Sequence, residues 1–470
     1  MKRFKRIIAM TMTLIMSMSF TACSEKAETT TEAVTEATTE AIPETTTEAT
    51  VEEATLTDVP EDNKVELVMP EMDSEPIYVY SWDESVDEKL QYFRNLYPQY
   101  ADLVQFVSLD LPKTSDEYKV AILQAIDNGG SESPSIIACD SEIARFFLES
   151  DITIPVADIG ITDEMYKNAY PYTVDFATVD DKLKGMTWEA TPGAFVYRTD
   201  IAEAVLGVSE PEEVQEYVKD WDTFFETAKL MSEAEYDMLS GCDDIKQVFL
   251  SQKSAPWVES ESVIIDQSVK DYMQVANILY TSDYTDETEL MDDGWNNNIT
   301  GDVFGYFGST WFVQDTINVD KDSETYGMRR VCAGPADYSW GGTYFGVTSK
   351  CSNKELAALV LYTICCDTDV MYNMSDETLD FVNNQESIKR LIDDGKGETP
   401  ILGGQNPLGI WDTVAKNANG KYATEFDMVF GEFVDDAVYG LNTGQYATVE
   451  DAVTYIKEQI KAYYPDFSVE

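Results

Sequence analysis

Alternating strand and helix patterns begin at residue 77 and constrain the fold more than any other feature of this chain of 470 residues. Short β-branched and aromatic runs predict strands at 77–80, 103–109 and 135–139, separated by amphipathic runs that predict helices at 86–97 and 118–128. Strands joined through helices in this way pair in parallel through right-handed crossovers. The sequence therefore predicts an α/β fold with parallel-rich sheets flanked by helices.

The rest of the chain continues this mixture of strands and helices. Ser352 and Glu355 form a capping-box pattern at the start of an apolar run. From residue 369 onward the pattern is mostly helical. The predicted elements are strands at 194–197 and 301–311, and helices beginning near 220–222 and covering 264–280, 352–366 and 449–464.

The first residues predict export from the cell. Four basic residues precede an apolar run at 7–20, which is shorter than the ~20 residues that a membrane-spanning helix needs. The end of this run, Thr21-Ala22-Cys23, resembles the lipobox of bacterial lipoproteins, although Phe20 stands where leucine is usual. The resemblance implies a signal peptide at 1–22 and a diacylated Cys23, an anchor of two acyl chains. The alternative is an ordinary secreted protein with an incidental cysteine.

Residues 23–75 predict a disordered linker. Glutamate recurs every fourth residue from Glu28 to Glu52, a spacing that would stack like charges on one face of a helix. Threonine and Pro43 also disfavour a helix, and few large apolar residues are present to form a core. We therefore expect a polyanionic spacer between the anchor and a folded region that starts at residue 76.

The composition excludes several functional classes. The chain has 88 acidic and 32 basic residues, a formal net charge of −56, which repels nucleic acids and anionic lipid headgroups. We expect no nucleic-acid partner, and membrane contact through the lipid anchor alone. The absence of histidine removes the Ser-His and Cys-His nucleophile arrangements and the commonest zinc ligand.

Neither a metal site nor a cofactor is predicted. Six cysteines follow Cys23 without a C-x-x-C pair; they are Cys139, Cys242, Cys332, Cys351, Cys365 and Cys366. Both disulfides and buried free thiols remain possible for an extracellular protein. Asn318-x-Asp320-x-Asp322 is similar to a calcium loop, but the glycine is missing and Arg329 occupies the twelfth position. We interpret this segment as a turn.

Five segments, taken in order, carry a resemblance to a known family. They are 78–82 (YVYSW), 133–140 (SPSIIACD), 185–200 (GMTWEATPGAFVYRTD), 305–311 (GYFGSTW) and 334–342 (GPADYSWGG). Together they resemble the extracellular solute-binding proteins of ABC sugar importers, the carbohydrate-specific family related to maltose-binding protein. Two departures from the family pattern are Ser135, where Asp is usual, and Arg198, where Asn is common.

This resemblance implies a two-lobed, class II periplasmic-binding-protein-like fold in which crossing hinge segments join the lobes and the ligand is clamped between them. The expected lobes are 76–186 with 331–367, and 187–330 with 368–470. The implied protein is a monomeric receptor without catalytic residues, anchored at the extracellular face of the cytoplasmic membrane. Its implied partners are a carbohydrate and the permease subunits of an ABC transporter.

A sugar needs aromatic platforms for its C–H faces and polar partners for its hydroxyls. Five tryptophans lie in turn-like contexts and are candidate platforms, with core packing as the alternative; we assign Trp221 to the core because Phe224 and Phe225 follow it on one helix. The candidate platforms are Trp82, Trp188, Trp257, Trp311 and Trp340. The candidate polar partners are Asp83, Glu84, Asp140, Glu189, Gln405 and Asn406, for which the alternative is an exposed surface position.

Two other functions compete with sugar binding. A surface glycoside hydrolase would need two carboxylates and no histidine, for example Asp83 or Glu84 with Glu189, but the spacing singles out no acid pair. The same fold could also bind a peptide, a polyamine or an organic anion. The five candidate indoles favour the carbohydrate.

Overall fold

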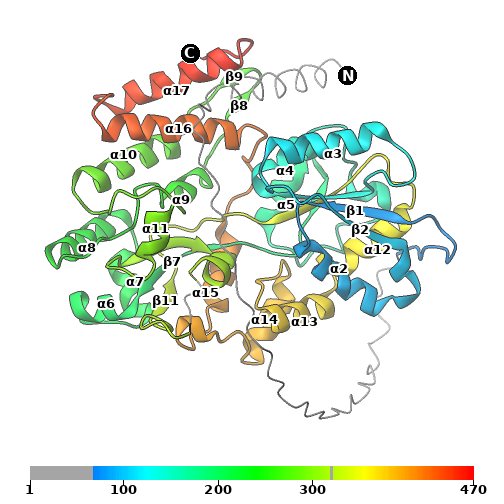
Figure 1. Ribbon diagram of the computed structural model, residues 1–470, viewed down its shortest axis with the longest axis horizontal. Coiled ribbons are helices and arrows are strands. Elements are labelled where there is room, and N and C mark those ends of the chain that lie inside the picture. Colours follow the sequence, from blue (N-terminus) through cyan, green and yellow to red (C-terminus); the bar gives the residue numbers. More distant parts are fainter. Residues whose placement is uncertain (1–66, 318–320, 470) are drawn as a thin grey trace, which may run out of the picture. The chain divides into compact units, whose positions relative to one another are not determined.

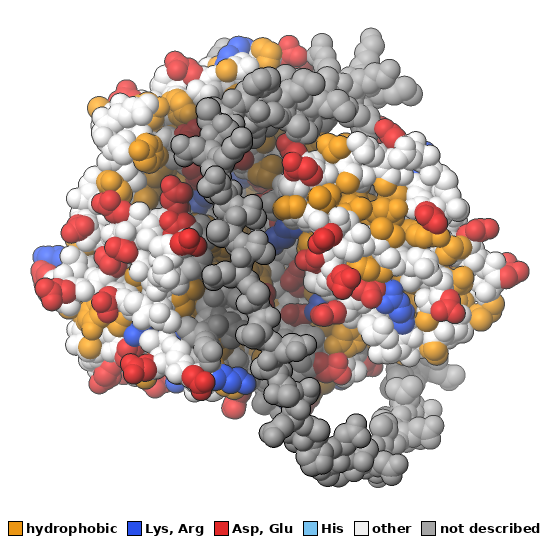
Figure 2. All heavy atoms as spheres, viewed as in Figure 1, with side chains coloured by type: hydrophobic (Ala, Val, Ile, Leu, Met, Phe, Trp, Pro, Cys, Tyr) orange, Lys and Arg blue, Asp and Glu red, His pale blue; other side chains and the backbone are white. Residues whose placement is uncertain are grey.

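The computed structural model describes residues 67–317 and 321–469 (Figure 1). The predicted signal peptide, Cys23 and the linker as far as residue 66 lie outside these residues, as do Asn318 and Asp320 of the predicted turn. Within the described part, no helix has the length and apolar character needed to cross a membrane. Acidic side chains are spread over the visible face (Figure 2), in agreement with the net charge of −56.

The first sheet contains the three strands predicted at the start of the folded region. Its order is β2-β1-β3-β12-β6, and β1 pairs in parallel with both β2 and β3. β12 adds to β3 in the antiparallel direction, which makes the sheet mixed. The strands are β1 (Ile77–Ser81), β2 (Val104–Ser108), β3 (Ile136–Asp140), β6 (Gly185–Met186) and β12 (Thr343–Val347).

The second sheet is antiparallel, with β7 (Gly193–Arg198) between β10 (Gly305–Ser309) and β11 (Arg329–Cys332). The Tyr338 hydroxyl shares its one hydrogen between the carbonyls of Ala194 on β7 (3.0 Å) and Gly308 on β10 (3.1 Å). A Cβ on Gly193 would lie 2.0 Å from the Tyr338 ring, so only glycine fits there. The strand predicted at 301–311 is shorter, because the chain becomes helical after Ser309.

Helices surround both sheets, and the predicted helices are confirmed. The helices before residue 260 are α2 (Ser85–Leu96), η2 (Pro98–Leu103), α3 (Asp116–Asn128), α4 (Ser141–Leu148), η3 (Val156–Ile159), α5 (Pro171–Ala177), α6 (Thr199–Leu206), α7 (Pro211–Val218), α8 (Trp221–Glu233) and α9 (Lys246–Leu250). The later helices are α10 (Gln267–Thr281), α11 (Asp293–Asn298), η4 (Phe312–Thr316), α12 (Lys354–Cys365), α13 (Thr368–Thr378), α14 (Gln385–Asp393), η5 (Pro400–Leu402), α15 (Leu408–Asn417), α16 (Asp427–Asn442) and α17 (Val449–Tyr463). Two short hairpins complete the fold: β4 (Thr178–Val179) with β5 (Lys182–Leu183), and β8 (Val258–Glu259) with β9 (Ser262–Val263).

A large aromatic core fills the space around the second sheet. Phe195 of β7 packs against Phe224 of α8 and Phe307 of β10, and α10, α16 and α17 contribute further side chains. Trp221 packs on this core as predicted, with its ring centroid 4.8 Å from that of Phe249. The six cysteines of the described residues carry free thiols; Cys242 is half-buried and the other five are buried.

Three chain segments lie side by side where the two sheets connect, and we call this region the junction. Residues 187–192 lead from β6 to β7, and residues 333–342 return from β11 to β12. The backbone of the first segment bonds the second through Trp340 N to Thr191 O (3.0 Å). It bonds a third segment, 381–383, through Ala190 N to Phe381 O (2.8 Å). The junction thus joins both sheets through backbone hydrogen bonds.

Candidate ligand-binding site

Trp311 and Trp340 meet at the junction although 29 positions separate them. Trp311 follows β10 and donates its indole N–H to the carbonyl of Trp340 over 3.0 Å. The two rings stand edge to face, with centroids 5.1 Å apart, and both side chains are half-buried. A Cβ on Gly341 would lie 2.8 Å from the Trp311 indole nitrogen, so the close approach requires glycine. Two of the five predicted platforms therefore form one aromatic pair.

Lys113, which was not among the residues predicted from the sequence, lies over the Trp311 ring of this pair. The Lys113 ammonium is 5.8 Å from the Trp311 ring centroid and forms an ion pair with Asp140 over 2.8 Å. Burial lowers the pKa of Lys113, but the adjacent Asp140 outweighs this effect and leaves that pKa raised. Asp140, at the end of β3, also accepts the backbone N–H of Glu142 and so caps α4. The predicted site residue Asp140 is thus connected to Trp311 through Lys113.

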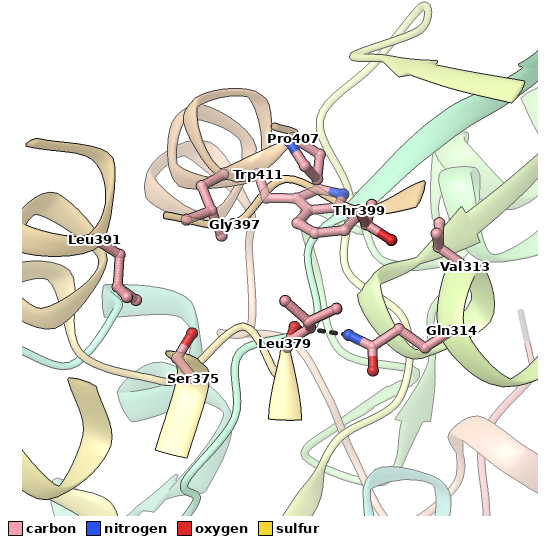
Figure 3. Close-up of a pocket in the computed structure, with 10 residues that line it drawn as sticks. Val313, Gln314, Ser375, Leu379, Leu391, Gly397, Thr399, Pro407 and Trp411 are labelled. Carbon is pink, nitrogen blue, oxygen red and sulfur yellow. Dashed lines mark hydrogen bonds between the residues drawn. The ribbon is translucent and has the colours of Figure 1, made fainter. Parts of the chain in front are cut away.

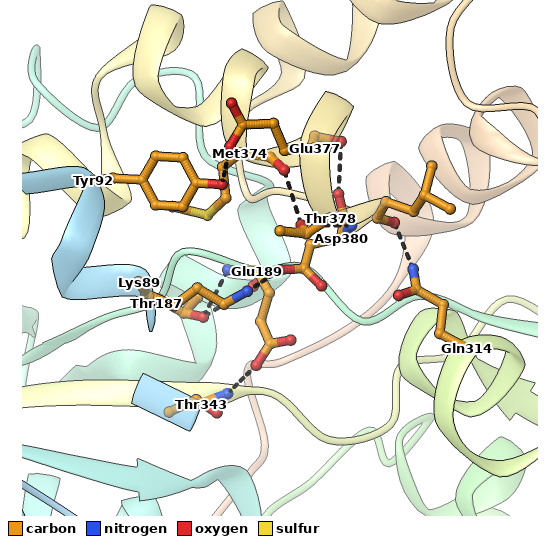
Figure 4. Close-up of polar contacts among 12 residues, drawn as sticks. Lys89, Tyr92, Thr187, Glu189, Gln314, Thr343, Met374, Glu377, Thr378 and Asp380 are labelled. Carbon is orange, nitrogen blue, oxygen red and sulfur yellow. Dashed lines mark hydrogen bonds and ion pairs between the residues drawn. The ribbon is translucent and has the colours of Figure 1, made fainter. Parts of the chain in front are cut away.

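Glu189 lies in the first junction segment and links it to the start of β12 (Figure 4). Its carboxylate accepts the backbone N–H of Thr343 over 2.9 Å. Burial raises the pKa of Glu189 to about 7, with a further contribution from the negative charge of Asp380. Asp380 pairs with Lys89 of α2, whose ammonium is 5.9 Å from the Trp188 ring centroid. Trp188 itself is buried against Phe345 of β12.

The residues around Trp311 and Lys113 and the residues around Glu189 and Asp380 form one electrostatic cluster. The charge of Glu189 acts on Lys113, which raises the pKa of that lysine. Burial raises the pKa of Asp315 on η4, and the negative charge of Asp380 raises it further. The positive charges of Lys89 and Lys113 lower that pKa and so oppose the rise. We call the combined set the junction site: Lys89, Lys113, Asp140, Trp188, Glu189, Trp311, Asp315, Trp340 and Asp380.

Three predicted residues follow β1 and have local roles. Trp82 is buried edge to face against Tyr118 of α3. Asp83 is exposed and accepts both the backbone N–H and the hydroxyl of Ser85 at the start of α2. Glu84 is exposed and precedes that helix without a side-chain cap bond.

Trp257, Gln405 and Asn406 are bonded or packed elsewhere. Trp257 is only 1% exposed and belongs to the core around the second sheet, so a ligand cannot reach its ring in this structure. Gln405 exchanges two hydrogen bonds of 2.8 Å with the backbone N–H and carbonyl of Val331 on β11. Asn406 donates to the carbonyl of Lys396 and accepts the N–H of Leu408. We do not include these three residues in the junction site.

Lys89, Lys113 and Asp315 were not among the residues predicted from the sequence. A lysine within an amphipathic helix, such as Lys89, resembles any solvated helix residue in sequence. Lys113 could have been found, because it follows the strand predicted at 103–109 and carries the same strand-end signal as Asp140. Within residues 67–317 and 321–469, no group of three or more Cys, Asp or Glu is arranged to hold a metal ion.

Comparison with known proteins gives both a family and a fold. The family model for bacterial extracellular solute-binding proteins matches residues 111–390. No curated protein sequence matches the chain. A crystal structure of an extracellular solute-binding protein of family 1 is 14% identical with a TM-score of 0.70, over 83% of this chain and 100% of that one.

Two further structures hold sugars. The ABC transporter associated binding protein from B. animalis subsp. lactis, in complex with β-1,6-galactobiose, is 16% identical with a TM-score of 0.62, over 85% of this chain and 100% of that one. The galacto-N-biose/lacto-N-biose I-binding protein from Bifidobacterium longum, in complex with lacto-N-biose, is 16% identical with a TM-score of 0.61, over 84% of this chain and 99% of that one. The expected two-lobed α/β fold is confirmed. Because the family model covers more than half of the sequence, this chain belongs to the bacterial extracellular solute-binding proteins.

Proposed function

We propose that this solute-binding protein captures a carbohydrate at the junction site and delivers it to the permease of an ABC importer. The observation that carries the proposal is the Trp311–Trp340 pair, flanked by Lys113 and Asp140, where the two sheets meet. Structural relatives that hold β-1,6-galactobiose and lacto-N-biose support a sugar ligand.

The chemistry of the junction site suits a sugar. The C–H faces of a pyranose gain free energy when an indole ring removes them from water. The rim hydroxyls need partners, because each unpaired buried hydroxyl costs about 1–3 kcal/mol. Carboxylates such as Asp140, Glu189 and Asp315 accept from hydroxyl groups, and Lys89 and Lys113 donate to hydroxyl oxygens.

Two lobes clamp the ligand in this proposal. The boundaries expected from the sequence are 76–186 with 331–367, and 187–330 with 368–470. The pairing of β11 with β7 supports moving residues 331–332 to the second lobe. The bonds from Lys89 and Tyr92 of α2 to Asp380 and Glu377 support assigning α13 to the first lobe.

The protein is proposed to act as a monomeric receptor on the extracellular face of the cytoplasmic membrane, held there by acyl chains on Cys23. The test of the anchor is Cys23→Ala expressed in a lipoprotein-processing bacterium. The variant should remain an unlipidated precursor that incorporates no radioactive palmitate. Full membrane retention with labelling would contradict the anchor and leave the binding proposal unaffected.

The decisive experiment is a thermal-shift screen of the purified protein against mono- and oligosaccharides, with a peptide, a polyamine and an organic anion as other solute classes. A ligand at 100 times its Kd stabilises the folded state by ~2.7 kcal/mol. We expect a shift from at least one sugar and recovery of that sugar intact after incubation. A shift from only a non-sugar solute would overturn the carbohydrate assignment, and steady release of reducing ends would favour the hydrolase.

A further inference from the structure

Both ammonium groups of the junction site are held in the same way. Each lies over the face of an indole ring and pairs with one carboxylate, an environment that stabilises an ammonium ion through cation–π attraction and a charge-assisted hydrogen bond. The two sets are Lys113 with Trp311 and Asp140, and Lys89 with Trp188 and Asp380. The chain itself therefore supplies two ammonium groups to this site, and each is already neutralised by a carboxylate.

Two further carboxylates of the junction site have no such partner. Glu189 and Asp315 form no ion pair with any residue in the described part of the chain. Burial raises the pKa of both, and the negative charge of Asp380 raises each further, although the charge of Lys89 opposes the rise. Four carboxylates thus face two ammonium groups, and the junction site carries an excess of negative charge.

These carboxylates are held together by a contact of η4. The Gln314 amide donates to the carbonyl of Leu379 over 2.6 Å (Figures 3 and 4), and the next residue on each side of this bond is Asp315 or Asp380. Glu189 and Asp380 each use one oxygen in a bond, and the second oxygen of each lies on the side toward Gln314 (Figure 4). Asp315 is exposed and the other two carboxylates are half-buried, so a ligand can reach them.

A cationic group on the ligand would balance this charge. A hydroxyl group can donate to a carboxylate but leaves its charge in place, whereas an ammonium group donates up to three N–H bonds and neutralises it. Partial burial strengthens the attraction relative to water. We propose that the ligand is a carbohydrate with a free amino group, whose ammonium is received by Glu189, Asp315 and Asp380. This inference rests on the proposed carbohydrate function and narrows it to cationic amino sugars.

The test measures affinities by isothermal titration of the full chain at pH 7 with sugars that differ in one substituent per ring. The sets are glucosamine with glucose and N-acetylglucosamine, galactosamine with galactose and N-acetylgalactosamine, and diglucosamine with cellobiose and di-N-acetylchitobiose. At least one amino sugar should bind about tenfold or more tightly than both of its uncharged counterparts, the scale of one charge-assisted hydrogen bond. Glucuronate, which brings a negative charge, should bind more weakly than glucose.

Glu189→Gln and Asp315→Asn remove one charge each and keep an oxygen that can accept a hydrogen bond. Each should lower the ratio of amino-sugar to hydroxyl-sugar affinity by about fivefold, the difference between a charged and an uncharged acceptor, and the double variant should abolish the preference. Glu226→Gln and Asp222→Asn make the same changes at exposed positions of α8 and should keep the ratio. Melting temperatures check that all variants are folded.

The ratio separates specificity from a structural role, because a merely structural change lowers both affinities equally. An unchanged ratio in both site variants would overturn the amino-sugar inference while the sugar-receptor function stands. So would a panel in which sugars bind but no amino sugar binds more tightly than its counterparts. Failure of every sugar to bind, with or without binding of a polyamine, would overturn the proposed function and this inference with it.

Discussion

At the scale of single residues, Trp311 and Trp340 differ from the other three candidate platforms, which are buried, because both keep exposed surface and touch each other across the junction. Trp311→Ala and Trp340→Ala should each weaken sugar binding by about 1–3 kcal/mol, the scale of a lost stacking platform. Isothermal titration measures the loss. Trp221→Ala is the control, and it should lower the melting temperature more than either variant without changing the affinity. Two variants that melt as low as this control but bind sugar normally would place the pair in the core.

Glu189 should make stability depend on pH. Its pKa of about 7, against 4.5 for the free side chain, means that the folded state binds more protons than the unfolded state between these values. Stability therefore falls as pH rises through this window and levels off above about 7. Glu189→Gln cannot lose a proton, so its stability relative to wild type should increase from pH 5 to pH 8, by roughly 1–3 kcal/mol.

Chemical denaturation at the two pH values measures this difference. Glu84→Gln changes the same group at an exposed position and supplies the baseline. If the difference in stability between Glu189→Gln and wild type stays constant with pH, folding does not change the pKa of the Glu189 carboxyl.

At the scale of elements, a side chain that the sequence predicted as a sugar partner serves a strand instead. Gln405 supplies a donor and an acceptor to the edge of β11. Gln405→Ala should lower the free energy of unfolding by about 1–3 kcal/mol, because it leaves the Val331 amide and carbonyl unpaired, and sugar affinity should not change. Gln91→Ala, at an exposed helix position, is the comparison. Loss of binding with normal stability would restore Gln405 as a ligand residue.

The start of α12 shows how tertiary contacts select between local signals. Ser352 and Glu355 predicted the cap, but Asn353 provides it by accepting the N–H of Leu356 over 3.1 Å. The Asn353 amide also donates to Ser74 and to the carbonyl of Glu75. Those two residues belong to the end of the predicted linker, so a contact 278 positions away fixes which residue caps the helix.

At the scale of the whole molecule, the proposed binding mode requires the lobes to approach each other. Contacts such as Gln314 with Leu379 and Lys113 with Trp311 connect η4 and its N-cap residue to segments that pack on the first sheet. A sugar that binds across these contacts favours the closed arrangement. Saturating sugar should therefore reduce the radius of gyration in solution scattering, and Trp311→Ala should require more sugar for the same change. An unchanged radius at saturation would contradict closure.

The sequence by itself determined the local elements, the α/β class and the family resemblance, because hydrophobic periodicity and turn residues act within a few positions of each other. It did not determine that the second sheet is antiparallel, that Trp257 is in the core, or that Lys89 and Lys113 join the site. Five tryptophans in similar turn-like contexts gave similar signals, yet only Trp311 and Trp340 pair at the junction. That outcome depends on which distant segments pack together, and packing across tens to hundreds of residues leaves no local pattern in the sequence.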